Sequence, residues 1–134
     1  ISRGDWSSDV CSSDLSSMLK ASKSWWGSEC YKGTLQLNAL TLDTFLERNE
    51  LGFDFDLLNV DTQGAEMMVA RGASKVLENV RFINCEVTFF NPQYQNNPRF
   101  DEVNEYFEGF GFEHIHTELC DEKNWGDGLW IKSA

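Results

Sequence analysis

Residues 57–66, with the sequence LLNVDTQGAE, constrain the fold more than any other part of this chain. An apolar strand ends there in an acidic residue, Asp61, and turns at once through Gly64 into a helix. In open parallel α/β sheets, ligands bind outside the carboxyl ends of the strands. The segment therefore predicts a parallel sheet covered by helices, with a ligand site at Asp61.

Each polar residue of this segment has a functional and a structural interpretation. Asp61 stands at the end of the strand and Gln63 follows in the turn, where Gly64 supplies the backbone freedom that a tight turn needs. Glu66 lies in the first helical turn, where the helix dipole favours an anion. The local chemistry is equally consistent with a structural alternative, in which Asp61 or Thr62 only caps the helix and Glu66 only complements its dipole.

The first residues of the chain do not look like part of a domain. Residues 5–15, DWSSDVCSSDL, match one reading frame of a sequencing-library adapter, so we expect residues 1–15 to be a non-native tail. A disordered native tail is the disfavoured alternative, because chance would have to reproduce the whole frame. Residues 16–134 then suit one domain or part of one.

Charge and cysteine content exclude several classes of protein. The chain carries 22 acidic and 11 basic residues, a net charge of −11, and without the −2 of residues 1–15 it keeps −11 + 2 = −9. Such a surface repels phosphate backbones and argues against a nucleic-acid binder. No stretch is apolar enough to cross a membrane. Outside the tail the chain has three cysteines, an odd number without paired spacing: Cys30, Cys85 and Cys120. This pattern argues against a disulfide framework or a zinc site and favours a reducing compartment, the cytoplasm.

Hydrophobic periodicity predicts an alternation of strands and helices. The first part is expected to hold strands at 34–40, 55–61 and 81–87, a helix that follows a Thr41 cap and ends near Gly52, and a helix at 65–79 that Gly72 interrupts. The second part is expected to hold a loop at 89–99, a helix at 100–110, and strands at 112–119 and 129–132 joined by an acidic turn at 120–128. This alternation predicts a parallel sheet, and the last two strands, with no helix between them, must form a hairpin.

Three further features have a favoured structural reading. The aromatic loop at 89–99 is a candidate wall of a substrate pocket, although it could be a plain connector. His114 and His116 share one face of a predicted strand, a pattern more typical of a polar face than of a metal site. Met67 and Met68 are more typical of core filling than of redox chemistry.

Several short motifs occur in an order that points to a known family. They are SSML at 16–19, TLD at 41–43, DTQGAE at 61–66, GA at 72–73, Glu86, and WGD at 125–127. Together they resemble the carboxyl-terminal half of an FkbM-type methyltransferase, a class I enzyme that uses S-adenosylmethionine, over residues 16–132. The resemblance implies a partial doubly wound, Rossmann-like sheet, mostly parallel, with the antiparallel closing strand 129–132 inserted beside strand 81–87.

The resemblance also implies roles for particular residues. It implies methylation of a hydroxyl on a small molecule or a glycan, with no metal, and a carboxylate could take the hydroxyl proton. The candidates are Asp61 and Glu86 for catalysis, Asp61, Gln63 and Ser17 for the cofactor S-adenosyl-L-methionine, and Glu66, Trp125 and Asp127 for the substrate. The structural alternatives are a solvated strand end for Glu86, a first-turn anion for Glu66, which we favour, and a plain hairpin turn at Trp125.

One part of the family pattern is missing from this sequence. The family begins with a strand and a glycine-rich turn, D-x-G-A-N-x-G, followed by a second strand whose acidic end holds the ribose, and neither occurs here. We therefore expect residues 16–134 to be the carboxyl-terminal portion of the domain and this chain to be inactive alone. Two alternatives stay open, a non-catalytic α/β interaction module with an acidic surface and another doubly wound enzyme that binds a nucleotide through the missing half.

Overall fold

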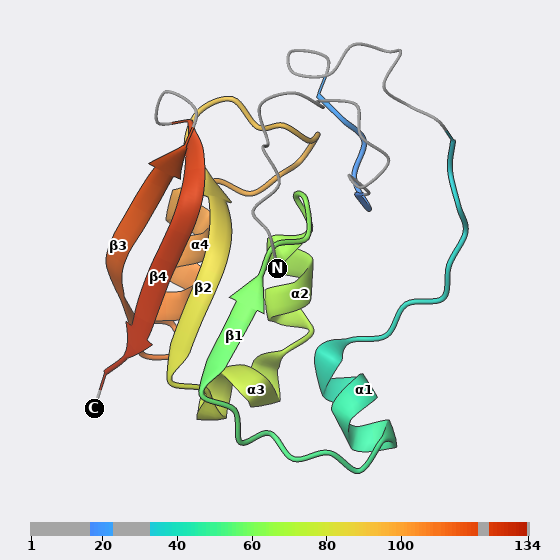
Figure 1. The fold of residues 1–134 in the computed structure, drawn as a ribbon, viewed down its shortest axis with the longest axis vertical. Coiled ribbons are helices and arrows are strands. Elements are labelled where there is room, and N and C mark those ends of the chain that lie inside the picture. The colour runs from blue at the N-terminus through green and yellow to red at the C-terminus, as the bar shows by residue number, and fades with distance from the viewer. Residues whose placement is uncertain (1–16, 23–32, 121–123, 134) are drawn as a thin grey trace, which may run out of the picture.

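A computed structural model of the chain describes residues 17–22, 33–120 and 124–133. Within these ranges strands are separated by helices along the chain, except for the last two strands, which follow one another (Figure 1). The elements are α1 (Leu42–Arg48), β1 (Leu57–Val60), α2 (Glu66–Arg71), α3 (Ser74–Asn79), β2 (Phe82–Thr88), α4 (Phe100–Glu108), β3 (Phe112–Cys120) and β4 (Trp125–Lys132). None of these helices has the length and apolar character that crossing a membrane requires.

The four strands form one mixed sheet in the order β1-β2-β4-β3. β1 and β2 are parallel, with Leu58 opposite Ile83 and Val60 opposite Cys85. β4 is antiparallel to both β2 and β3 and lies between them. The predicted parallel pair, the closing hairpin and the insertion of the last strand beside β2 are thus confirmed, whereas the doubly wound arrangement stays a prediction.

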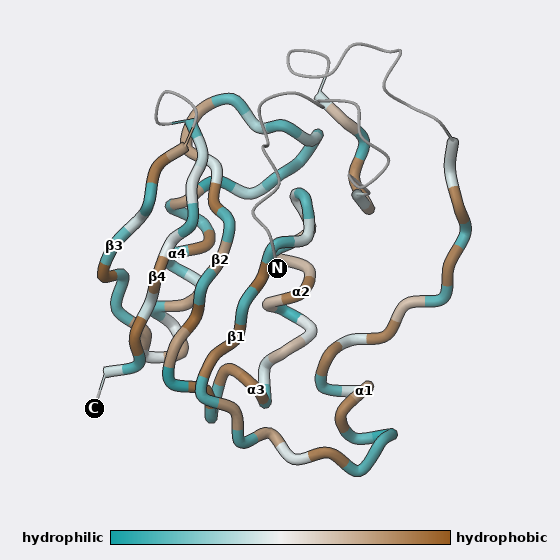
Figure 2. The backbone as a smooth tube through the Cα atoms, viewed as in Figure 1, coloured by the Kyte–Doolittle hydropathy of each residue, from teal (hydrophilic) through white to brown (hydrophobic). Residues whose placement is uncertain are grey.

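The core lies between one face of this sheet and the helices. Along β1 and β4 buried and exposed residues alternate, so each strand buries one set of side chains, and hydrophobic residues, brown in Figure 2, occur on both strands. Trp130 of β4 is fully buried, its ring centroid is 5.1 Å from that of Phe107 in α4, and its indole N–H donates to Asn104 Oδ1 at 3.0 Å. The indole therefore joins the sheet to α4 without leaving a polar atom unsatisfied.

Two predicted helix boundaries are confirmed. Thr41 caps α1, where its Oγ1 accepts a hydrogen bond from the Thr44 backbone N–H at 3.1 Å. The predicted interruption at Gly72 separates α2 from α3. A Cβ atom at Gly72 would lie 3.0 Å from Thr41 Cβ, so glycine at this position also lets the start of α1 approach closely.

The strand predicted at 34–40 is wrong. Residues 34–40 form no strand, and they run apart from the sheet (Figure 1). Leu35 and Leu37 are 85% and 80% exposed. Alternation alone does not make a strand, because its backbone N–H and C=O groups also need a neighbouring strand.

The turn predicted at 120–128 is shorter than expected. β3 extends to Cys120 and β4 begins at Trp125, so Trp125 and Asp127 lie in β4 and not in a turn. Cross-strand pairing explains the difference, because Trp125 pairs with both Cys120 and Thr88. The expected core also changes at Met68, which is 52% exposed, whereas Met67 is buried.

The two histidines lie on opposite faces, contrary to the prediction. A bulge in β3 between them adds one residue, so His114 pairs with Trp130 and His116 pairs with Leu129. His114 packs against the buried Trp130 ring, with centroids 5.0 Å apart, and its Nε2 hydrogen-bonds Thr117 Oγ1 at 2.8 Å. Within the described ranges, no group of three or more His, Cys, Asp or Glu side chains is arranged to hold a metal ion.

Candidate active site at the carboxyl ends of β1 and β2

The two catalytic candidates lie beside each other at one end of the sheet. Asp61 directly follows β1, whose last residue Val60 pairs with Cys85 of β2, and Glu86 is the next residue of β2. The Asp61 side chain is exposed, whereas Glu86 is 9% exposed. Their carboxyl groups are within hydrogen-bonding reach of each other. Parallel pairing therefore brings an exposed and a buried carboxyl group together.

The surroundings of Glu86 oppose its ionisation. Burial, followed by the negative charges of Asp61 and Glu66, raises the pKa of Glu86 to about 8. Burial and the charge of Asp61 also raise the pKa of Asp127. Glu86 is then mostly protonated at neutral pH and can donate a hydrogen bond to the Asp61 carboxylate, because two adjacent like charges cannot both ionise easily.

The turn after Asp61 depends on glycine for two reasons. Gln63 and Gly64 both have positive φ, 55° and 96°. A Cβ atom at Gly64 would lie 2.9 Å from Cδ2 of the Tyr94 ring, which packs over the turn. Glycine thus meets the predicted need for backbone freedom and also allows Tyr94 to approach, while Gln63 adopts a conformation that non-glycine residues rarely take.

Gln63 connects the carboxyl pair to other parts of the chain. Its Nε2 donates to Asp61 Oδ1 at 2.9 Å and lies 3.5 Å from Glu86 Oε2. Its Oε1 accepts from the Tyr94 hydroxyl at 2.9 Å, and its backbone oxygen accepts from Ser17 Oγ at 2.5 Å. The three candidates for cofactor binding, Asp61, Gln63 and Ser17, are therefore adjacent, and Tyr94 joins them.

Glu66 lies in the first turn of α2, as expected, and its carboxylate binds the turn that precedes the helix. It is 3% exposed, and its Oε1 accepts from Thr62 N at 2.9 Å, Gly64 N at 3.0 Å and Thr62 Oγ1 at 3.2 Å. Ala65 is the N-cap of α2, and no side chain caps it. The alternative that Asp61 or Thr62 caps the helix is therefore wrong, because Glu66 folds back onto the turn instead.

The remaining substrate candidates lie beside the carboxyl pair on β4. Asp127 pairs with Glu86 across the sheet, and Trp125, two residues earlier on the same strand face, pairs with Thr88. The Asp127 side chain is exposed, and Trp125 is half-buried. Their proposed contact with substrate stays a prediction, but the register places both at the same end of the sheet as Asp61.

Tyr94 is the site residue that the sequence did not identify. The loop at 89–99 is long and aromatic, and two of its residues, Gln93 and Tyr94, are buried at 8% and 5% exposure. Residues 20–22 run beside it, with Ser22 N donating to Gln93 O at 2.7 Å. No local spacing relates Tyr94 to Gln63, which lies 31 residues earlier, so only the fold reveals the contact.

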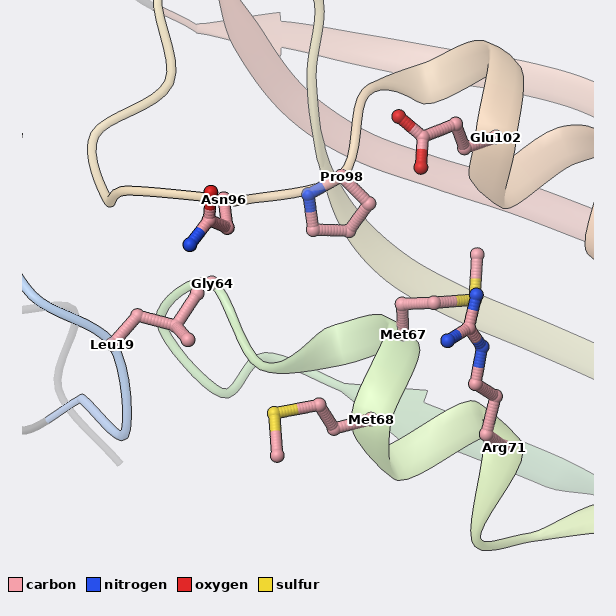
Figure 3. A pocket seen from close by; sticks show the side chains of 8 residues that line it. All are labelled: Leu19, Gly64, Met67, Met68, Arg71, Asn96, Pro98 and Glu102. Carbon is pink, nitrogen blue, oxygen red and sulfur yellow. The ribbon is translucent and has the colours of Figure 1, made fainter.

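A small pocket lies next to the same turn, at Gly64 (Figure 3). It has a volume of about 170 Å³ and is open to one side. It is lined by Leu19, Gly64, Met67, Met68, Arg71, Asn96, Pro98 and Glu102. Only Gly64 belongs to both this pocket and the turn of the carboxyl site, so the pocket is adjacent to the candidate active site and not part of it.

The structure is that of an α/β chain. A pair of carboxyl groups lies where its two parallel strands, β1 and β2, end. A family model for the methyltransferase FkbM domain matches residues 4–114, most of the chain. This chain therefore belongs to the FkbM methyltransferase family, as its motifs implied. Comparison with curated proteins and with solved structures gives no match.

Proposed function

We propose that this chain is the carboxyl-terminal portion of an S-adenosylmethionine-dependent methyltransferase that methylates a hydroxyl of a small molecule or a glycan. Membership of the FkbM family supports methyl transfer. The observation that carries the proposal for the site is the pairing of exposed Asp61 with buried Glu86 at the carboxyl ends of two parallel strands. Sites of this kind occur where such strands end.

The pair supplies what transfer to an oxygen needs from the protein. Methyl transfer to a hydroxyl is an in-line displacement, in which most of the catalysis is positioning of the nucleophile. A base must also take the hydroxyl proton. Asp61 is exposed and can accept that proton, while the protonated Glu86 beside it donates a hydrogen bond that holds the Asp61 carboxylate in place.

The negative charge of the described residues at this site suits a positively charged cofactor. S-adenosylmethionine supplies a methyl group on a positively charged sulfur and also carries an ammonium group. Asp61 and Asp127 place carboxylates at the strand ends, where they would attract those charges, and Asp61, Gln63 and Ser17 are the residues that would hold the cofactor. We propose that the rest of the cradle, including the glycine-rich turn, belongs to sequence upstream of this portion.

The sheet itself supports the proposal of an upstream portion. Within the described ranges, β1 pairs only with β2, so its other edge is open. Leu57, Leu129 and Ile131 are 52%, 37% and 37% exposed, and the strand register places them on one face of the sheet. Sheets with parallel strands are normally covered on both faces, so further helices and strands would complete this one.

The experiment uses the intact protein recovered from the unbroken reading frame. It is incubated with S-adenosylmethionine labelled in its methyl group and with a deproteinised extract of small molecules and glycans from the source cells. We expect the label in methyl ethers formed at hydroxyl groups. Label found only on nitrogen would contradict hydroxyl methylation, and absence of both transfer and cofactor binding would contradict the proposed function.

A further inference from the structure

The hydrogen bonds around Gln63 fix which end of its amide faces the carboxyl pair. An amide side chain has one accepting oxygen and one donating NH₂ group. The Tyr94 hydroxyl lies 2.9 Å from Oε1, and Asp61 Oδ1 lies 2.9 Å from Nε2. A reversed amide would place its oxygen against a carboxylate, so the NH₂ group must face Asp61, and the Tyr94 hydroxyl must be the donor to Oε1.

This orientation affects the two carboxyl groups differently. The Gln63 NH₂ group is 2.9 Å from Asp61 but 3.5 Å from Glu86. A hydrogen bond donated to a carboxylate stabilises its charged form, so the amide favours ionisation of Asp61 over ionisation of Glu86. Tyr94 is 5% exposed and its ring packs on Gly64, so its hydroxyl holds the amide from a fixed position.

We propose that Gln63 and Tyr94 are positioning residues that keep the proton of the carboxyl pair on Glu86 and leave Asp61 as the ionised base. The assignment of Asp61 as a base rests on the proposed function, whereas the location of the proton does not. Tyr94 acts through Gln63, from a loop that the sequence separates widely from the turn. The loop at 89–99 thereby sets the protonation of the site.

The other charged and titratable groups around Glu86 all oppose its ionisation. Asp61, Glu66 and Asp127 each place a negative charge near it. The Cys85 thiol is buried next to it, and burial, Glu66 and Glu86 raise the pKa of Cys85, so the thiol stays neutral. These carboxylates therefore act in the same direction as the Gln63 amide, which lies closer to Asp61 than to Glu86 and so leaves the proton on Glu86.

The test is a pH titration of the 134-residue chain by carbon-13 NMR of the Asp61 and Glu86 carboxyl carbons. In the wild type we expect the Glu86 carbon to titrate near pH 8 and the Asp61 carbon to keep its carboxylate shift through that transition. Tyr94→Phe keeps the ring on Gly64 but frees the amide. In that variant the upper apparent pKa should rise by about 0.5 or more, and Asp61 should join the transition.

Tyr106→Phe is the matched control. It also removes a tyrosine hydroxyl, but Tyr106 lies on α4 and not against Gln63. Gln63→Leu removes the donor itself and should give at least the shift of Tyr94→Phe. The inference is overturned if Tyr94→Phe leaves both carbons unchanged, or if Tyr106→Phe moves them equally. A shift in Gln63→Leu alone would overturn the role of Tyr94. These outcomes are independent of methyl transfer, so failure of the proposed function would be recognised separately, in the turnover assays of the intact protein.

Discussion

At the scale of single residues, the site depends on environments that differ between chemically similar side chains. Asp61 and Glu86 are both carboxylic acids at strand ends, but Glu86 is buried and Asp61 is exposed. Glu66, also buried, accepts three hydrogen bonds from Thr62 and Gly64 and so serves the turn. Burial and hydrogen bonding, and not residue type, therefore separate the proposed base Asp61, its partner Glu86 and the structural anion Glu66.

Ionisation of Glu86 should destabilise the fold as the pH rises. Its pKa is raised from 4.5 to about 8 in the folded chain, so its contribution to stability is fully present below pH 4.5 and is lost as the pH rises through 8. The rise corresponds to an upper bound of about 5 kcal/mol, since one pKa unit is worth about 1.4 kcal/mol. Glu86→Gln should therefore unfold at higher urea concentration than the wild type at about pH 9 and differ less at about pH 5.

Urea unfolding of Glu105→Gln controls for the general loss of a negative charge, because Glu105 is exposed on α4. That variant should follow the wild type at both pH values. An unchanged pH dependence in Glu86→Gln would show that Glu86 is not the group responsible.

Gly64→Ala should cost more stability than Gly111→Ala. Both glycines have positive φ, 96° and 81°, so alanine strains the backbone at each by about 1 kcal/mol. A Cβ atom at Gly64 would also meet the Tyr94 ring at 2.9 Å, whereas a Cβ at Gly111 meets nothing within 4 Å. The difference in the free energy of unfolding, from denaturant titration, isolates the contact with Tyr94. Equal losses would mean that the ring moves away without cost.

At the scale of elements, contacts between neighbouring helices replace local caps. The N-cap of α3, Ala73, provides no side-chain hydrogen bond. Asp43 of α1 supplies it instead, because Oδ2 accepts from the Lys75 backbone N–H at 3.0 Å and Oδ1 from that of Val76 at 3.4 Å. Asp43, in the first turn of α1, thus caps α3, and this contact also attaches α1 to the rest of the domain.

Asp43→Ala should therefore lower the free energy of unfolding by about 1 kcal/mol, the usual loss for a helix cap. Asp101→Ala is the control, since Asp101 occupies the first turn of α4 and is exposed. Chemical denaturation of both variants tests the difference. A loss no greater for Asp43→Ala than for Asp101→Ala would reduce Asp43 to a complement of its own helix dipole.

Predictions from sequence succeeded where the deciding interactions are local. The Thr41 cap and the break at Gly72 depend on neighbouring residues, and the inserted closing strand followed from the family resemblance. The strand at 34–40 failed because pairing is decided elsewhere in the chain, and the bulge between His114 and His116 left no signal in the alternation. The order of the strands is enough to predict that Asp61 and Glu86 lie next to each other. The contact of Tyr94 with Gln63 could not be predicted in this way, because it depends on how the loop at 89–99 folds over the turn.

At the scale of the whole molecule, the described ranges form a sheet with a site at one end and an open face. The rows Leu57–Phe82–Ile131 and Asp61–Glu86–Asp127 cross the same sheet, the first apolar and the second acidic. Because both rows lie on one face, elements that cover the apolar row would also enclose the acidic one. We expect the proposed upstream portion to complete the core and to enclose the candidate active site.

The turnover of Asp61→Asn in the intact protein tests the central claim most directly. The substitution keeps the size of the side chain and removes its charge, so methyl transfer should fall by at least about a hundredfold. Asp54→Asn, an exposed position ahead of β1, should keep full turnover. Intact binding of S-adenosylmethionine would assign Asp61 to the acceptor, and lost binding would assign it to the cofactor. Full turnover of Asp61→Asn would contradict the account and remove Asp61 from the active site.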